Sequence, residues 1–389
     1  MNFIKISWKS LWSNQLTFFL NVLLIAFGTG ILTLLLLGYT QIGDKLRGNA
    51  KGIDLVVGAK GSPLQLILSS IYFIDFPTGN ISLKDAEELS RNPMVKRAVP
   101  LALGDNYNGF RIVGTDTGFI SLYQLKLATG KFWQNDYEMI IGSEVARSEK
   151  LKIGDKIYGS HGLTTAEDLH EEHPYILTGI LEPQGNSSDN LALTNIASIW
   201  KMHGIKENEN REITSLLIQY RSRMSMVVFP MMVNKSTAMQ AASPAKESAR
   251  LFSLIGVGVD TLQWFAIILM LIAGISIFVS LYNSLKERMY DLALMRVMGA
   301  SQSGLFLIII LEGLILTIIG SCIGVFLGHI FLQVIGHFQD SSQAKVTGLY
   351  FMHEEIYLIA GGLFIGVIAS ILPAIQAYRS DISKIISQS

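Results

Sequence analysis

Residues 262–300 read LQWFAIILMLIAGISIFVSLYNSL and then KERMYDLALMRVMGA, an apolar run that changes abruptly into a charged segment at Lys286. A bilayer core about 30 Å thick needs roughly 20 apolar residues of helix, so the first part can span a membrane. The second part predicts a short helix with Met298 as its last residue, because Gly299 suits the left-handed turn that follows a helix. Ser301 is placed to cap the next helix. We therefore expect two membrane helices joined by a short helix outside the membrane.

The composition is that of a membrane protein with a soluble portion. Of the 389 residues, 50% are hydrophobic and only 16% are charged, which is unusual for a soluble protein. The formal net charge of zero gives no indication of a nucleic-acid partner. Cys322 is the single cysteine, so an intramolecular disulfide is excluded.

Four apolar runs predict four membrane spans, at 17–39, 262–285, 305–335 and 356–377. Basic residues in short flanks mark the cytoplasmic side of a membrane protein. Here they precede the first span, separate the second from the third and follow the fourth: Lys5, Lys9, Lys286, Arg288, Arg296, Arg379 and Lys384. The loop between the third and fourth spans carries Lys345 with Asp340, Glu354 and Glu355. Both termini and the middle loop are therefore expected in the cytoplasm, and the long segment after the first span outside it.

This reading divides the chain into nine parts. They are an N-terminal interfacial helix (1–15), the first span (16–40), a large extracytoplasmic α+β domain with stalk helices (41–260), the second span (261–285), a cytoplasmic helix (286–303), the third span (304–335), a short outer loop (336–355), the fourth span (356–378) and a cytoplasmic tail (379–389). Trp8 and Trp12 favour a helix in the headgroup layer over a simple positive anchor for the N-terminal part.

The extracytoplasmic segment mixes strand and helix patterns. Short apolar runs predict strands at 53–57, 98–103, 110–114, 139–141, 176–181, 215–220 and 226–233. Ser82 is a predicted N-cap for a helix to about residue 91, which Asn92-Pro93 ends. Residues 236–260 are expected to be helix running into the second span, and the first span has no stop signal before Gly48. Both membrane entries are therefore predicted to be helical stalks.

Motifs for chemistry are sparse. Residues 58–62 share glycines and a lysine with a phosphate loop but lack the spacing that cradles phosphates, so we expect the energy to come from an ATPase partner. The densest group of metal-capable residues is His161, Asp168, His170, Glu171, Glu172 and His173. Zinc or haem binding is conceivable there, but the usual closed ligand spacings are absent. We favour an exposed loop and predict no metal site.

Two features of the third span concern packing. Glu312 is an ionisable residue within a membrane helix, which indicates either a functional group or a hydrogen-bonded packing contact, and both readings stay open. Gly320, Gly324 and Gly328 recur every four residues, a spacing that lets helices approach closely. We expect this face to pack within the subunit or across a dimer.

The charged helix at 286–300 is predicted to bind a partner. Its apolar residues lie on all sides, and a helix that is apolar all round has to be covered. The membrane can cover one side and a partner the other. An ordinary positive-inside loop is the alternative, which we disfavour because the segment offers so little polar surface.

These residues resemble the FtsX-like, or MacB-type (type VII), ABC transporter permeases. Residues 283–288 and 291–301 are similar to the coupling segment of that family, and Glu312 with its glycine ladder resembles the third span. Pro373-Ala374 and Ala377-Tyr378-Arg379 are similar to the closing motif, whereas the proline that often follows it is absent from residues 380–382. Residues 54–57, 142–146 and 152–155 resemble the MacB-like periplasmic core domain.

The resemblance implies a permease dimer, identical or related, in a bacterial inner membrane with two copies of a separate ABC ATPase. ATP and magnesium would be bound by that partner, and this chain would bind no cofactor. The residues implied to couple to the ATPase are Lys286, Glu287, Arg288, Asp291, Leu292, Arg296 and Gly299. Motion would pass through the stalks to the outer domain and expel or extract a lipoprotein, peptide, antibiotic or haem. Whether a periplasmic adaptor or lipoprotein also takes part stays open.

Two other functions compete with transport. One is a transducer that activates an outside partner such as a cell-wall hydrolase, although the predicted outer segment is large for that role. The other is a membrane-anchored enzyme, which we disfavour because no motif has a recognised catalytic spacing.

Overall fold

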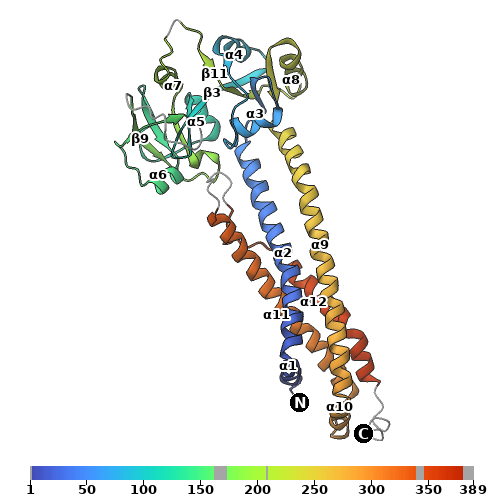
Figure 1. Cartoon of the computed structure of the whole chain (residues 1–389). Coiled ribbons are helices and arrows are strands. Elements are labelled where there is room, and N and C mark those ends of the chain that lie inside the picture. The colour runs from blue at the N-terminus through green and yellow to red at the C-terminus, as the bar shows by residue number, and fades with distance from the viewer. Residues whose placement is uncertain (1, 162–172, 207–208, 339–345, 380–389) are drawn as a thin grey trace. The chain divides into compact units, whose positions relative to one another are not determined.

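The computed structural model describes residues 2–161, 173–206, 209–338 and 346–379 and divides into two domains (Figure 1). The helical domain comprises Met1–Gln41, Ile255–Gln339 and Val346–Ser389, and the α+β domain is Ile42–Leu254 with Asp340–Lys345. The division falls inside two long helices, α2 (Gln15–Asn49) and α9 (Pro244–Glu287), so each continues from one domain into the other.

The described part of the helical domain contains six helices: α1 (Phe3–Ser13), α2, α9, α10 (Met289–Val297), α11 (Gln302–Phe338) and α12 (Glu355–Tyr378). Among the described residues, α2, α9, α11 and α12 are long and apolar enough to cross a membrane. With 35, 44 and 37 residues, α2, α9 and α11 exceed the roughly 20 residues that one crossing needs. The four-helix prediction is confirmed by length and composition, and three of the helices extend beyond the predicted spans.

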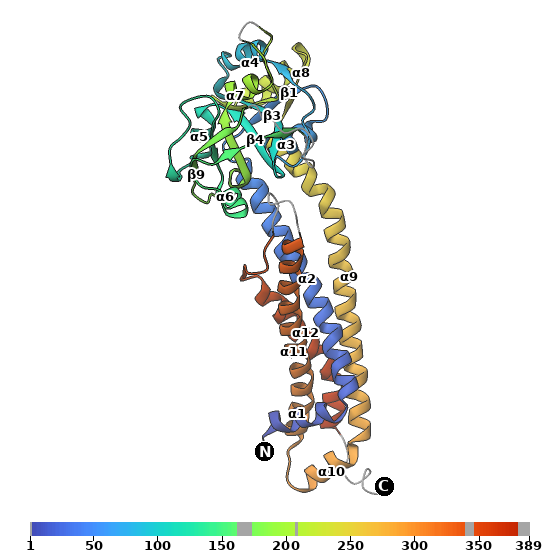
Figure 2. The ribbon, with the colours of Figure 1, turned by 60° about the vertical axis from the view of Figure 1, so that its left-hand side comes forward.

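The short helices agree with the capping signals. Ser301 Oγ accepts from Gly304 N at 3.1 Å, so it caps the start of α11 as predicted. Gly299 has φ +100°, the left-handed conformation that glycine adopts without strain. The helix predicted to start at Lys286 begins later, because Lys286 and Glu287 still belong to α9 and α10 starts at Met289. The last residue of α10 is Val297, with Met298 as its C-cap, so the helix ends one residue earlier than the sequence suggested. The N-terminal helix α1 lies against the first part of α11 (Figure 2). There Ser7 Oγ donates to Ile308 O at 3.0 Å.

The α+β domain is organised by an 11-stranded sheet in the order β13-β1-β12-β3-β4-β10-β6-β9-β5, with β7 paired to β9 and β8 to β3. Two of its pairings are parallel, β4 with β10 and β6 with β9. The strands are β1 (Leu55–Ala59), β3 (Val95–Tyr107), β4 (Phe110–Thr115), β5 (Leu127–Gly130), β6 (Glu138–Ile141), β7 (Lys156–Ile157), β8 (Ser160–His161), β9 (Tyr175–Leu181), β10 (Leu191–Asn195), β12 (Ser215–Tyr220) and β13 (Met239–Ala242). A separate pair joins β2 (Ile81–Ser82) to β11 (Glu212–Ile213).

Both faces of this sheet are buried. Leu55 and Val57 of β1 belong to one hydrophobic core, and Val56 between them belongs to a second. Leu216 and Leu217 of β12 divide between the two cores in the same way. Because side chains alternate between the faces of a strand, strands covered on both faces have continuous apolar runs, as the sequence has here.

Helices cover the sheet: α3 (Pro63–Ser70), α4 (Leu83–Ser90), α5 (Thr117–Tyr123), α6 (Ser143–Glu149), α7 (Ile196–Met202) and α8 (Ser225–Ser236), with a 3-10 turn at Ser187–Asn190. The helix after Ser82 is confirmed, although the Ser82 side chain makes no capping hydrogen bond. The sequence did not predict α3, α5, α7 or β10.

Two predictions for this domain are wrong. Residues 226–233 are helical, within α8, and not a strand, because Ser225, Phe229 and Val233 recur every four residues as its buried face. Residues 236–260 are not one helix, because β13 pairs with β1 before α9 begins at Pro244. Proline fits the first turn of a helix, where its missing N–H is not needed.

Candidate coupling site

The segment between α9 and α11 turns twice. Arg288, with φ −107° and ψ 13°, separates the end of α9 at Glu287 from the start of α10 at Met289. Gly299 makes the second turn. The chain thereby places a helix of nine residues at the end of the helical domain (Figure 1).

One face of α10 is fixed to the helical domain. Leu292 and Ala293 are 2% and 3% exposed. Leu292 belongs to the core cluster that contains Leu285 of α9, Leu305 of α11 and Ala377 of α12. This side of α10 is therefore part of the apolar core of the helical domain. Leu292 was expected among the coupling residues and faces inward.

The opposite face of α10 is apolar and exposed. Tyr290, Leu294, Val297 and Met298 have exposed fractions of 48%, 40%, 64% and 79%. Tyr290, Leu294 and Val297 are spaced by four and three residues, which places them along one side of α10, and Met298 follows as its C-cap. We call these four residues the exposed face of α10. The sequence analysis predicted that a partner covers one apolar side of this segment, but it did not identify these four residues.

The charged residues of the segment differ in exposure. Lys286, Glu287 and Asp291 are exposed, and Lys286 Nζ lies 4.6 Å from the centre of the Tyr282 ring. Arg296 is partly buried, and its Nη1 has no hydrogen-bond partner among the described residues. A buried donor without a partner costs free energy.

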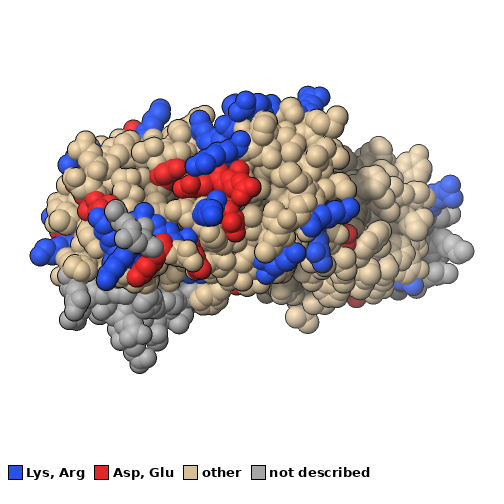
Figure 3. All heavy atoms as spheres, turned by 90° about the horizontal axis from the view of Figure 1, so that it is seen from above, with Lys and Arg blue, Asp and Glu red and all other residues tan. Residues whose placement is uncertain are grey.

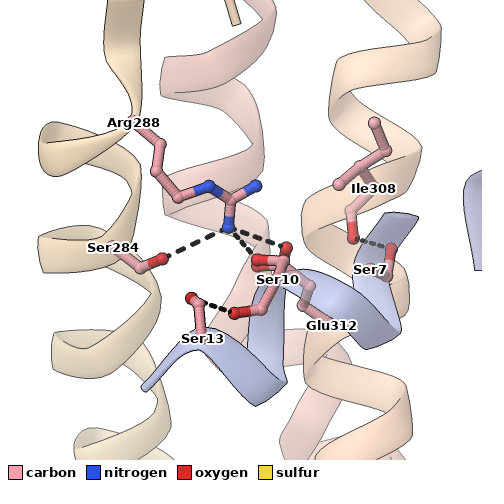
Figure 4. A network of polar contacts seen from close by, with 7 residues as sticks. All are labelled: Ser7, Ser10, Ser13, Ser284, Arg288, Ile308 and Glu312. Atoms are coloured by element: carbon pink, nitrogen blue, oxygen red, sulfur yellow. Dashed lines mark hydrogen bonds and ion pairs between the residues drawn. The ribbon is translucent and has the colours of Figure 1, made fainter. Parts of the chain in front are cut away.

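Arg288 joins three helices (Figure 4). Its Nη1 donates to Glu312 Oε1 of α11 at 3.2 Å, to Ser284 Oγ of α9 at 3.4 Å and to Ser10 Oγ of α1. The Glu312 side chain is 1% exposed and that of Arg288 20%. Glu312 thus forms a buried ion pair, and a carboxylate removed from water is tolerated when it is paired in this way.

The glycine ladder of α11 faces α2. A Cβ atom on Gly320 would lie 2.8 Å from Ile25 Cβ, and one on Gly324 would lie 2.6 Å from the carbonyl oxygen of Ala26. A Cβ on Gly328 would lie 3.0 Å from the carbonyl oxygen of Gly30. The helices therefore pack at a distance that only glycine permits. Pro373, the remaining residue singled out for packing, is buried inside α12.

In the α+β domain, the ends of the long helices are held by tyrosines. Tyr72 Oη donates to Leu46 O of α2 at 3.2 Å and lies 2.7 Å from Ser248 Oγ of α9. Burial raises the pKa of Tyr72, against the smaller opposing effect of its hydrogen bond to Ser248. Tyr123 Oη donates to Asn49 O at 3.2 Å, and Asn49 Oδ1 accepts from Ser187 N at 2.8 Å. Both helices are thus attached to the body of this domain.

The region proposed as an exposed loop can be described only in part. Asp168, His170, Glu171 and Glu172 lie outside the described residues, and so does the side chain of His161. The His173 ring stacks on Tyr137 with 5.4 Å between ring centres. Within the residues the structure describes, no group of three or more His, Cys, Asp or Glu side chains is placed to hold a metal ion.

On the face seen in Figure 3, side chains of both charges are interspersed.

Comparisons with known proteins agree with both domains. A family model described as the FtsX-like permease C-terminal region matches residues 264–382, and one described as the MacB-like periplasmic core domain matches residues 18–242. The pyoverdine export ATP-binding/permease protein PvdT of Pseudomonas fluorescens is 22% identical over 415 residues, covering 97% of this chain and 58% of that protein. The macrolide export ATP-binding/permease protein MacB of Nitrobacter winogradskyi is 22% identical over 330 residues, covering 78% of this chain and 47% of that protein. The chain therefore spans about half the length of these relatives.

Two solved structures resemble part of the chain. The extracellular domain of the noncanonic ABC-type transporter YknZ from Gram-positive bacteria gives a TM-score of 0.33 at 14% identity, covering 49% of this chain and 99% of that structure. The periplasmic region of MacB from Actinobacillus actinomycetemcomitans gives a TM-score of 0.36 at 10% identity, covering 54% of this chain and 97% of that structure.

Proposed function

Because this chain belongs to the FtsX-like permeases with a MacB-like periplasmic core domain, we propose that it is the membrane subunit of an inner-membrane exporter driven by a separate ABC ATPase. The observation that carries the proposal is the exposed face of α10, which consists of three apolar residues of the helix and the apolar residue at its C-cap, while the other side of the helix is packed into the helical domain. Apolar surface of this kind marks an interaction site. In this proposal the ATPase covers the exposed face of α10, and ATP and magnesium are bound by the ATPase.

The proposed mechanism is mechanotransmission. Closure of the ATPase on ATP displaces α10, and the displacement passes to α9 through the chain and to α1 and α11 through Arg288. The helices α2 and α9 continue into the α+β domain. Their ends are attached there at Leu46, Asn49 and Ser248, so axial or rotational motion of either helix would act on that domain.

The division of labour within the coupling segment follows from burial. The contact with the ATPase is bordered by Lys286, Glu287, Asp291 and the partly buried Arg296. Arg288 and Leu292 transmit the force within this chain, and Gly299 sets the angle of the turn. In this proposal, only some of the seven residues that the family resemblance implied for coupling contact the ATPase directly.

The proposed cargo is a lipoprotein, peptide, antibiotic or haem-like molecule handled on the outer side of the membrane. The relatives named for pyoverdine export and macrolide export support an exported cargo of this range. We also propose a second permease copy in the complex, identical or related, as the family resemblance implies.

The test uses the complete permease purified with its ATPase and reconstituted into vesicles. Met298→Asp places a charge in the exposed face of α10. Loss of a buried interface residue costs about 2 kcal/mol or more, which is roughly a 30-fold weaker association. The matched control is Leu349→Asp, a residue 76% exposed in the loop before α12. Equal ATPase binding by both variants would refute the docking assignment.

The same vesicles distinguish transport from transduction. ATP hydrolysis stimulated by a cargo molecule, with release of that cargo, supports the exporter. Stimulation by an extracytoplasmic hydrolase alone, with no cargo released, would show that the chain is a transducer.

A further inference from the structure

A polar cavity of about 270 Å³ opens among α1, α2, α9 and α11. It is far larger than the roughly 10–15 Å³ that one water molecule needs. Its deepest side chains are those of Asn21 and Glu312, each 1% exposed, and Arg288 lies beside them. Ser13, Asn14 and Glu287 also line it and are exposed, so they mark its mouth.

The cavity lies at the level of lipid headgroups. Trp8 and Trp12 of α1 stack with 5.8 Å between ring centres, and Phe18 and Phe19 of α2 surround Trp12 at 5.6 and 6.0 Å. Both tryptophans are close to half exposed. Exposed tryptophans gather where hydrocarbon meets headgroups, and Ser10 and Ser13 on the same helix line the cavity.

Donors in the cavity are left without partners. Asn21 Oδ1 accepts from Ser276 Oγ at 2.7 Å, but Asn21 Nδ2 is buried with no hydrogen-bond partner among the described residues. Arg288 uses Nη1 for its contacts with Ser10, Ser284 and Glu312. Its Nη2 and Nε therefore remain available within the described structure, and two guanidinium N–H groups suit the oxygens of a phosphate.

The charge balance favours a ligand that also carries a positive group. Arg288 and Glu312 neutralise each other as an ion pair, and Glu287 adds one carboxylate at the mouth. A purely anionic ligand would meet that carboxylate unfavourably, whereas an ammonium group would pair with it. We propose that this cavity binds the headgroup of a zwitterionic membrane lipid with a primary ammonium. Its phosphate lies on Arg288 and Asn21, and its ammonium lies on Glu287.

Native mass spectrometry of the full chain with dioleoyl lipids tests the proposal. Phosphatidylethanolamine should bind about tenfold more tightly than phosphatidylcholine, whose ammonium cannot donate a hydrogen bond, because a hydrogen bond to a charged group has this order of strength. It should also bind more tightly than phosphatidylglycerol, which lacks the ammonium. Glycerophosphoethanolamine, the soluble headgroup, should not displace the lipid at equal concentration.

Two variants locate the site. Asn21→Leu removes the buried donor, and Glu287→Gln removes the exposed carboxylate without disturbing the core. Asn21→Leu should weaken the binding of all three lipids, because each carries the phosphate, whereas Glu287→Gln should abolish the preference for phosphatidylethanolamine. Tyr350→Ala, in the loop before α12, should leave both the affinity and the preference unchanged. Equal binding of the three lipids, displacement by the soluble headgroup, or an unchanged preference in Glu287→Gln would each overturn the inference.

Discussion

Removing either partner of the ion pair between Arg288 and Glu312 should destabilise the helical domain, and the two losses should be unequal. Arg288→Met leaves a carboxylate that is 1% exposed without its cation. Breaking a buried pair in this way costs about 3–5 kcal/mol, and we expect about 3 because Arg288 keeps 20% of its side chain exposed. Glu312→Gln should cost less, about 1–2 kcal/mol, since the remaining arginine reaches solvent and still contacts Ser284 and Ser10.

The assay is unfolding by SDS in mixed micelles, followed for the parent chain, both single variants and the double variant. Combining Arg288→Met with Glu312→Gln removes the uncompensated charge, so the loss should be at least about 1 kcal/mol smaller than the sum of the single losses. The control is the pair Arg91 and Glu87, whose side chains are 81% and 55% exposed. That pair should contribute at most about 1 kcal/mol.

Additive losses at Arg288 and Glu312, or a loss no larger than that of the control pair, would refute the reasoning. Either result would mean that the contact does not connect α9 to α11 energetically. Force applied at α10 would then have to pass through apolar packing alone.

Three further predictions concern the close packing, the other buried pair and pH. Gly324→Ala should destabilise the helical domain by about 1–3 kcal/mol in the same SDS assay, because its methyl would meet the Ala26 carbonyl at 2.6 Å. Gly258→Ala, on α9 with no atom within 4 Å, should stabilise it by up to about 1 kcal/mol. His329→Ala should cost more than Gln333→Ala, since His329 Nε2 lies 3.0 Å from the buried Glu355 Oε2. Hydrogen bonds from Gln134 N first of all, and from Asn135, lower the pKa of Glu138 to about 2. The thermal stability lost in Glu138→Gln should therefore be constant above about pH 4.5 and shrink as the pH falls toward 2.

Each of these has a contradicting result. Equal effects of Gly324→Ala and Gly258→Ala on stability would mean that α11 and α2 are not in close contact at Gly324. A smaller loss in His329→Ala than in Gln333→Ala would exclude a stabilising pair with Glu355. A Glu138→Gln difference that grows as the pH falls would reverse the sign of the linkage.

The features that the sequence predicts well are those encoded locally. The change from apolar to charged residues at Lys286, the turn at Gly299 and the cap at Ser301 each depend on neighbouring residues. The structure differs in the bounds of the short helix, which begins at Met289 and ends at Val297. Continuous apolar runs such as 215–220 become strands because both faces of the sheet are covered.

The missed features depend on contacts between distant residues. Arg288 and Glu312 are 24 positions apart, and no spacing rule joins them. In the segment 226–233, apolar residues stand on both the buried and the exposed sides of a helix, so the run resembles a strand until the four-residue recurrence of Ser225, Phe229 and Val233 is noticed. The exposed face of α10 could be identified only from the structure, because its residues are apolar like Leu292 and differ from it in burial.

Photo-crosslinking from the exposed face of α10 tests the central claim most directly. A photoreactive amino acid replaces Met298 in one variant and Leu349 in another, and each chain is crosslinked in its native membrane. The account predicts that the Met298 variant yields an adduct with a polypeptide that carries a Walker phosphate loop, and that ATP alters its yield. An adduct of that polypeptide with the Leu349 variant, and none with the Met298 variant, would contradict it.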